Sequence, residues 1–225
     1  GKTFNEIKKH FSPDALNKTF FHAHGTSTPQ NRESESHIIS SISKAFNIDA
    51  LPVTAIKSYL GHSLAAAGGD HMISTLGSWK NNIIPGITST PQLAENVHKE
   101  NVRFLLENKR IEDDEFDFAV LNAKGFGGNN GTSLVASPSK TMKMLESKYS
   151  KSNIKKYLIK KSKIDDQLND SKQEILQGDI QSRYIFGESV IDGMNDFDIE
   201  ADKITNKLNK EIFNLNSTLP YKDYL

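Results

Sequence analysis

Thr19-Phe20-Phe21-His22-Ala23-His24-Gly25-Thr26-Ser27-Thr28-Pro29 is the stretch that decides the fold. Its first six residues predict a short strand, because they are rich in aromatic residues and end at a glycine. Side chains alternate along a strand, so His22 and His24 point to one side and Ala23 to the other. His24 then stands at the carboxyl end of the strand, where α/β folds place ligand chemistry. Thr26 and Thr28 add two hydroxyls on one side of the following loop.

Outward from this strand, the apolar segments alternate between strand and helix patterns. Residues 31–46 predict an amphipathic helix whose apolar residues recur at helical spacing, namely Ile38, Ile39, Ile42 and Phe46. A second helix, rich in small residues, is predicted over 61–80, where Ala65 to Gly69 would permit close packing on a neighbour. Short strands are predicted at 53–56, 83–85, 118–122 and 132–136. This alternation, closed by a pair of strands, predicts an α/β sandwich.

A second segment with chemical potential reads Lys57-Ser58-Tyr59-Leu60-Gly61-His62 and follows a predicted buried strand. We expect His62 to open the helix over 61–80, where the positive end of the helix would oppose protonation of the imidazole. A neutral histidine that donates a hydrogen bond can stabilise a developing enolate oxygen. Lys57 on its own is equally consistent with a surface cation.

The third segment reads Asn122-Ala123-Lys124-Gly125-Phe126-Gly127-Gly128-Asn129-Asn130-Gly131 and lies between two predicted strands. Glycines here allow positive φ and let backbone N–H groups face one point, as an oxyanion hole requires. A phosphate-binding loop is the rival interpretation, but the segment has no Gly-Lys-Ser/Thr and enters a strand rather than a helix. A plain hairpin with a mobile tip would also fit.

The composition bounds the class of protein. The 225 residues carry no net charge and no cysteine, so disulfides, thiolate metal sites and a cysteine nucleophile are excluded from this chain. Zero net charge gives no general attraction to nucleic acid or to an anionic membrane. Because no apolar run approaches the length of a membrane span and no signal peptide is evident, we expect a soluble cytoplasmic protein.

Residues 138–225 form a polar extension after the apolar first part, which holds 11 of the 14 glycines. Helices are predicted at 141–149 and 165–177, and a disordered tail is the simplest expectation for 149–165. A small β meander is predicted from strand-like triplets at 184–186, 189–191 and 197–199, with Asp192-Gly193 as a turn. Seven lysines make the extension locally basic: Lys148, Lys151, Lys155, Lys156, Lys160, Lys161 and Lys163. A solvated helix face explains them best, and a docking patch for an acidic protein is the alternative.

Taken together and in this order, the three segments resemble the C-terminal half of the β-ketoacyl-[acyl carrier protein] synthases, condensing enzymes of the thiolase superfamily. That family carries His-Gly-Thr-x-Thr, Lys-Ser-x-x-Gly-His and Gly-Phe-Gly-Gly-x-Asn. The matching residues here are His24 to Thr28, Lys57 to His62 and Gly125 to Asn130. The resemblance covers roughly residues 15–137 and looks closest to a divergent bacterial subgroup with a C-terminal tail.

The resemblance implies a thiolase-like half over 1–137, with a mixed β-sheet packed between helices, followed by the extension over 138–225. It implies a decarboxylative Claisen condensation of a malonyl thioester with an acyl chain in fatty acid biosynthesis, an acyltransferase reaction without a cofactor or metal. A cysteine holds the acyl chain as a thioester, and an enolate formed from the malonyl thioester attacks it. An acyl carrier protein would deliver the substrate on phosphopantetheine, and the enzyme would be a homodimer.

Roles follow from the same resemblance. His24 and His62 would stabilise the enolate oxygen, and Lys57 would hold the geometry and electrostatics of the histidine pair. The N–H of Phe126 would form half of the oxyanion hole, and its ring would gate the acyl pocket. Pantetheine and substrate would contact the flanking loops, at Thr26, Thr28, Gly127, Gly128 and Asn129.

Two departures from the family pattern matter. Many relatives place a glutamate beyond the second histidine, near the lysine, where this chain has Asp70 and His71. The partner of Lys57 therefore stays open between these residues and a group elsewhere. The family nucleophile lies in the N-terminal half, which these residues do not contain. We therefore expect a fragment of a longer enzyme, or a subunit completed by another polypeptide, inactive in condensation by itself.

Two other functions compete with the condensing enzyme. A scaffold or partner subunit could keep the fold without catalysis, although it would have no chemical reason to keep both His24 and His62. A metal hydrolase could use His22, His24 and His62, but no carboxylate arrangement in the sequence completes such a site. Any one of these histidines taken alone could also be a structural group.

Overall fold

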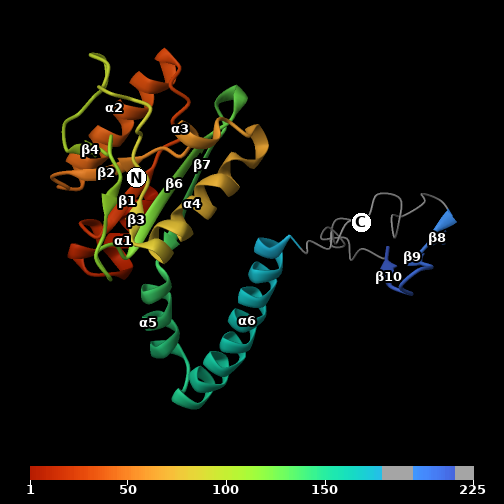
Figure 1. Ribbon diagram of the computed structural model, residues 1–225. Coiled ribbons are helices and arrows are strands. Elements are labelled where there is room, and N and C mark those ends of the chain that lie inside the picture. Colours follow the sequence, from red (N-terminus) through yellow and green to blue (C-terminus); the bar gives the residue numbers. More distant parts are fainter. Residues whose placement is uncertain (179–194, 216–225) are drawn as a thin grey trace, which may run out of the picture. The chain divides into compact units, whose positions relative to one another are not determined.

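The computed structural model describes residues 1–178 and 195–215 (Figure 1). Its chain forms two compact units, Gly1–Leu158 and Ile159–Leu225. The predicted family boundary after residue 137 stays a prediction. All three chemical segments belong to the first unit.

A five-stranded sheet forms the centre of the first unit, in the order β4-β2-β1-β6-β7 (Figure 1). Four strands run parallel, and β7 pairs antiparallel with β6 as a hairpin. The strands are β1 (Thr19–His22), β2 (Leu51–Thr54), β4 (Val102–Phe104), β6 (Phe118–Lys124) and β7 (Asn130–Ala136). The strand that carries His22 is thus central, flanked by β2 on one side and by β6 on the other.

Helices cover both faces of this sheet (Figure 1). On one face, α1 (Lys2–His10) and α2 (Pro29–Ala45) contribute Phe4, Ile7 and Ile39 to a core with Phe21 and Phe118. On the other face, α4 (Ala67–Asn81) packs Met72 and Trp79 against a second core, which contains Phe20, Ala119 and Leu121. The alternation of β1 side chains between these cores confirms the predicted mixed sheet between helices.

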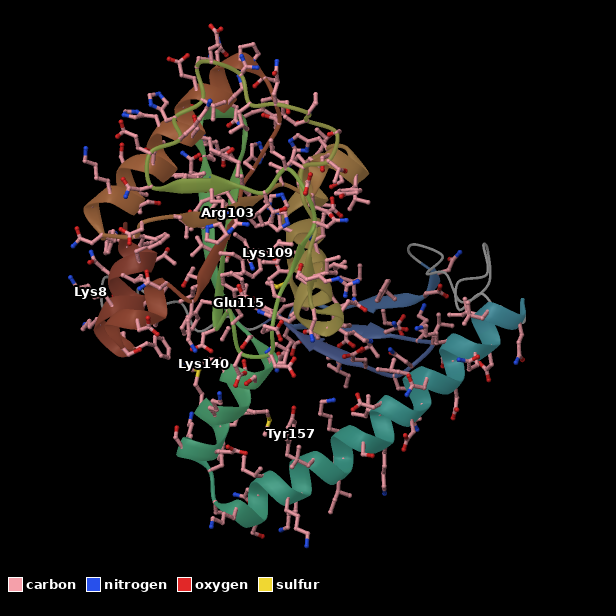
Figure 2. All side chains as sticks on the ribbon, turned by 60° about the vertical axis from the view of Figure 1, so that its left-hand side comes forward. Lys8, Arg103, Lys109, Glu115, Lys140 and Tyr157 are labelled. Atoms are coloured by element: carbon pink, nitrogen blue, oxygen red, sulfur yellow. The ribbon has the colours of Figure 1, made fainter. Side chains whose placement is uncertain are left out.

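A separate two-stranded antiparallel ribbon pairs β3 (Ile83–Ile84), which follows α4 in the chain, with β5 (Lys109–Arg110). The sequence predicted β3 but missed β4 and β5, which are three and two residues long, and it also missed α1 and the 3₁₀ turn η1 (Pro13–Leu16). Lys109 forms an ion pair with Glu115 at 2.7 Å, and Figure 2 labels both residues. The elements β4, β5 and η1 carry too few residues for a periodic pattern to identify them, whereas α1 is nine residues long and its length does not explain why it was missed.

The helix predicted over 61–80 is wrong in its first part. A single turn, α3 (Lys57–Leu60), comes first, then the 3₁₀ turn η2 (Leu64–Ala66), and α4 begins only at Ala67. Gly61 has φ of 72° and Leu64 has φ of 56°, so the chain leaves the right-handed helical region directly after α3 and again at the first residue of η2. His62 therefore lies between α3 and η2 and does not open a helix.

The first helix of the extension, α5 (Pro138–Lys148), belongs to the first unit and packs against its sheet through Lys140. Lys140, which Figure 2 labels, forms an ion pair with Asp117 at 3.3 Å and lies over the rings of Phe11 and Phe118. The side chain of Ser137 caps the helix by accepting a hydrogen bond from the N–H of Lys140. This helix begins three residues earlier than predicted because the cap and Pro138 form its first turn.

Helix α6 (Lys151–Gln177) runs across the division between the units. Its helical course from residue 151 overturns the expectation of a disordered tail over 149–165. In the second unit, β8 (Phe197–Ile199), β9 (Lys203–Asn206) and β10 (Ile212–Asn214) form an antiparallel meander. The predicted strand at 197–199 is confirmed as β8, whereas the predicted strands at 184–186 and 189–191 lie outside the described residues.

We predict that Phe118→Ala lowers the free energy of unfolding by about 3–5 kcal/mol, since Phe118 is buried where β6 meets Phe11 and the first core. The matched control is Ile38→Ala, which truncates an apolar residue that is 51% exposed on α2 and should cost less than about 1 kcal/mol. Urea denaturation of both variants measures the difference. Equal losses would show that the first core does not lie under β6.

Candidate active site around His24, Lys57 and His62

The backbone at the end of β1 is held by the buried carboxylate of Glu35, which comes from α2. One oxygen accepts from the N–H of His24 at 2.9 Å and from the side-chain amide of Asn122 at 2.6 Å. The other accepts from the N–H of Gly25 and from the side chain of Asn31, both at 3.0 Å. Glu35 thereby joins the end of β1 to α2 and to β6.

Sequence reasoning missed Glu35. Its neighbour Glu33 lies on the same helix and is exposed, so nothing in the composition of α2 separates the two acids. The one available signal was the spacing of Asn31 and Glu35, which places an amide and a carboxylate one helical turn apart directly after the His-Gly turn.

Lys57, from α3, stands between two imidazoles. Its Nζ lies 3.3 Å from Nδ1 of His24 and 3.2 Å from Nε2 of His71, and it also donates to the backbone carbonyl of His24. Burial lowers the pKa of Lys57, while Glu35 and Asp70 oppose that shift. Asp70 itself accepts a hydrogen bond from Ser63, so His71 is the group of the two that contacts the lysine.

His22 and His71 form a stacked pair beneath this lysine. Their ring centroids are 4.5 Å apart with planes 21° from parallel, and both side chains are buried. Burial, and then the neighbouring His71, lowers the pKa of His22 to about 3, whereas burial and then Lys57 lowers that of His71 to about 4. Both nitrogens of His22 and Nδ1 of His71 lack a hydrogen-bond partner among the described residues. Both rings are therefore neutral at physiological pH.

His62 approaches His24 edge-on, with ring centroids 5.2 Å apart and planes at 81°. Each histidine accepts a backbone N–H at Nδ1, from Leu64 at 3.0 Å for His62 and from Lys124 at 3.2 Å for His24. An imidazole nitrogen that accepts carries no proton, so both neutral rings carry their proton on Nε2. Burial, and then Lys57, lowers the pKa of His24, which favours the neutral ring.

The loop after His24 borders a hollow of about 490 Å³. Its lining joins polar groups beside the histidines, Thr26, Lys57 and His62, to an apolar wall that includes Ile39 and Phe104. The hydroxyls of Thr26 and Thr28 lie 3.5 Å apart, as the loop pattern predicted. A hollow with reactive polar groups near the mouth and apolar walls suits a substrate with a flexible chain.

The glycine-rich segment forms the turn of the β6–β7 hairpin, at η3 (Phe126–Gly128). Gly127 and Gly128 take φ of 74° and 81°, conformations that residues with a Cβ adopt rarely. A second hollow, lined by His24, Gly125 and Asn129 among others, lies beside this turn. The ring of Phe126 is 93% exposed, so within the described residues this side chain stands apart from the histidine cluster.

Comparisons of the chain with a family model and with known proteins agree on one family. Residues 13–90 match the model of the β-ketoacyl synthase C-terminal domain. The chain is 39% identical over 188 residues to β-ketoacyl-[acyl-carrier-protein] synthase FabY of Pseudomonas aeruginosa, covering 83% of this chain and 29% of that protein. It is 30% identical over 116 residues to 3-oxoacyl-[acyl-carrier-protein] synthase 2 of Vibrio harveyi, covering 50% of this chain and 26% of that protein. The chain thus spans less than a third of the length of these relatives.

Among solved structures, the noncanonical ketosynthase FabY from P. aeruginosa superposes on the chain with a TM-score of 0.80 at 34% identity. That match covers 100% of this chain and 35% of the FabY chain. It therefore includes the C-terminal extension as well as the sheet unit.

Because His22 is kept neutral in the folded protein, we predict that it makes the free energy of unfolding fall as the pH is lowered. The pKa of His22 is lowered from 6.5 to about 3, so between these values the unfolded chain binds a proton that the folded chain does not. In this range the free energy of unfolding should fall by about 1.4 kcal/mol for each unit by which the pH is lowered, from this one group. His22→Gln should reduce the slope of unfolding free energy against pH by that amount, measured between pH 6 and about pH 4.

The control for this experiment is His37→Gln, which makes the same substitution at an exposed position of α2. Because the slope is compared and not the absolute stability, a variant that is less stable overall still tests the prediction. An unchanged slope in His22→Gln would mean that His22 is protonated in the folded state.

Proposed function

Because this chain carries a β-ketoacyl synthase C-terminal domain and belongs to the thiolase-like condensing enzymes of fatty acid synthesis, we propose that it supplies the decarboxylating histidine pair of a 3-oxoacyl-[acyl carrier protein] synthase. The observation that carries this proposal is the shared tautomer of His24 and His62. Each ring is held by a backbone N–H at Nδ1 and so keeps an Nε2–H free to donate.

Such donors fit the chemistry of decarboxylation. When a malonyl thioester loses carbon dioxide, the electrons of the broken carbon–carbon bond form an enolate, and negative charge develops on the thioester oxygen. Two preorganised N–H donors, His24 and His62, stabilise that oxygen without a change of protonation state. The enolate carbon then attacks an acyl thioester on a cysteine, and the cysteine leaves as thiolate. Lys57 supports the stabilisation of the enolate oxygen, because its ammonium contacts Nδ1 of His24.

The remaining substrate contacts are assigned to the loops that frame the two hollows. We place the phosphopantetheine arm against Thr26 and Thr28, whose hydroxyls lie at one side of the loop after His24. The backbone N–H of Phe126 supplies half of the oxyanion hole for the acyl thioester, supported by the positive φ of Gly127 and Gly128. Asn129 is a further substrate contact in the same turn. The exposed ring of Phe126 is the gate of the acyl pocket.

The cysteine must come from a further segment, since the chain contains none. We assign the outer face of α4 as its docking surface, because Ile73 is 72% and Leu76 45% exposed there. On the same face a Cβ added at Gly69 or Gly77 would meet no atom within 4 Å. An apolar face with small residues at helical spacing suits close packing of another element. The chain is then the C-terminal half of the enzyme and, by itself, inactive in condensation.

Three further assignments belong to this proposal. An acyl carrier protein delivers the substrate, and the enzyme works as a homodimer in the cytoplasm.

The lysine run over 148–163 lies on α5 and α6 and is the candidate docking patch for the acidic carrier, although a solvated helix face explains it as well. In the described part of the chain, no helix is long and apolar enough to cross a bilayer. A scaffold without catalysis is the alternative function, and the paired tautomers count against it.

We predict that His24→Ala and His62→Ala each lower decarboxylation of malonyl-[acyl carrier protein] by about 10²–10³-fold, because each removes one donor to the enolate oxygen. Carbon dioxide release by the protein, assembled with its cysteine-bearing segment, measures this loss. The matched control is His37→Ala, which removes an exposed histidine of α2 and should leave the rate unchanged. Full activity in both variants would show that decarboxylation does not depend on this histidine pair, whereas no activity in the unmodified assembled protein would favour the scaffold.

We also predict that Gly69→Leu blocks docking of the cysteine-bearing segment while the fold of this chain persists. A Cβ at this position would have no atom within 4 Å, and the leucine side chain would project from the face assigned to docking. Condensation should be lost, and limited proteolysis should cleave the protein faster, whereas Ala45→Leu adds leucine to an exposed position of α2 and should change neither. Unchanged activity in Gly69→Leu would place the docking surface elsewhere.

A further inference from the structure

The buried cluster around Lys57 contains an uncommon choice of partner. In the described residues, the hydrogen bonds of the Lys57 ammonium go to Nδ1 of His24, to the carbonyl of His24 and to Nε2 of His71. None of these acceptors is an anion. The two nearby carboxylates are committed elsewhere, Glu35 to four N–H donors and Asp70 to Ser63.

This contact fixes the tautomer of His71. An ammonium offers only donors, so the imidazole nitrogen that faces it must present a lone pair. Nε2 of His71 is therefore unprotonated, and its proton is on Nδ1. The tautomer is the opposite of that of His24 and His62, which carry their protons on Nε2.

A neutral partner has an electrostatic consequence that an acid would not have. A carboxylate at this position would cancel the charge of Lys57 in an ion pair. A neutral imidazole holds the ammonium in place but leaves its charge to act on Nδ1 of His24, 3.3 Å away. A cation at Nδ1 opposes protonation of the His24 ring and strengthens its Nε2–H as a donor.

The surroundings of His71 keep it neutral. Its side chain is fully buried and stacked on His22, and the lysine ammonium lies 3.2 Å from Nε2. Protonation would place two cations in contact in a buried site, which is strongly unfavourable. The other titratable groups that face the cluster are Glu35 from α2, Asp70 from α4, Lys124 from β6, and His22 and His62.

We propose that His71 is a positioning residue for His24, acting through Lys57 as a neutral acceptor that holds the ammonium against Nδ1 of His24 without cancelling its charge. The inference rests on the proposed function for its catalytic meaning but not for its geometry. It assigns the partner of Lys57, which the sequence left open between Asp70 and other groups.

The test uses three variants of one position. His71→Gln keeps an acceptor near the place of Nε2, and His71→Asn has an acceptor that is too short to reach Lys57. His71→Glu reaches Lys57 but cancels its charge. Long-range proton–nitrogen NMR of the ¹⁵N-histidine-labelled protein reports the tautomer of each ring and the pKa of His24, without any need for activity.

In the unmodified protein we expect an Nδ1–H tautomer for His71 and Nε2–H tautomers for His24 and His62. His71→Glu should raise the pKa of His24, and His71→Gln should leave it unchanged. In decarboxylation, His71→Asn should lose about 100-fold through misplacement of about 1 Å, while His71→Gln should rescue most of the rate. Asp70→Asn is the matched control and should preserve the His24 titration, because Asp70 contacts Ser63 rather than Lys57.

An Nε2–H tautomer for His71, or a His24 pKa that His71→Glu leaves unchanged, would overturn the proposal. These NMR outcomes are separate from failure of the proposed function, which would appear as full decarboxylation by His24→Ala with the tautomers as expected. Circular dichroism of each variant confirms that the fold is retained before titration. Should His71→Glu unfold, the comparison of His71→Gln with His71→Asn decides the same question.

Discussion

The site depends first on one buried carboxylate. Glu35 accepts four N–H donors, two from the backbone of His24 and Gly25 after β1 and two from side chains on α2 and β6, so a single side chain fixes where the backbone of His24 lies relative to the neighbouring strand. Charge-assisted hydrogen bonds of this kind are stronger than neutral ones, and leaving any of these buried donors unpaired would be costly. The position of the His24 backbone, which carries one of the two site histidines, therefore follows from the side chain of a residue on α2.

Much of the fold could be predicted because its signals are local. The strand β1, which ends at His22 rather than at His24 as predicted, the hairpin around Phe126 and the helix that begins at Pro29 all follow from periodicity and glycine placement. The continuous helix over 61–80 could not be corrected from sequence, since Leu64 adopts a left-handed conformation that no propensity marks. Because His62 does not open a helix, a helix dipole cannot keep its ring neutral as predicted. The tautomer of His62 is instead fixed by the N–H of Leu64.

The candidate site shows the same division between local and tertiary information. Residues that lie in motifs, His24, Lys57 and His62, are brought together by the structure as the family pattern implied. Glu35 and the stacking of His22 on His71 depend on the crossing of α2, β1 and α4, which no single segment contains. A buried acid among exposed acids, or a buried histidine among exposed histidines, becomes visible only when burial is known.

Charge balance explains why an imidazole suits position 71. The buried carboxylate of Glu35 and the ammonium of Lys57 both act on His24 and His71, and they shift the pKa of these histidines in opposite directions. An acid at position 71 would add a second negative charge to this enclosed space. That charge would favour imidazolium rings, and an imidazolium at His24 could no longer accept the hydrogen bonds of Lys57 and Lys124 at Nδ1. With a neutral residue there, one anion fixes the backbone, one cation acts on the ring, and His24 stays in the form that can donate to a developing oxyanion.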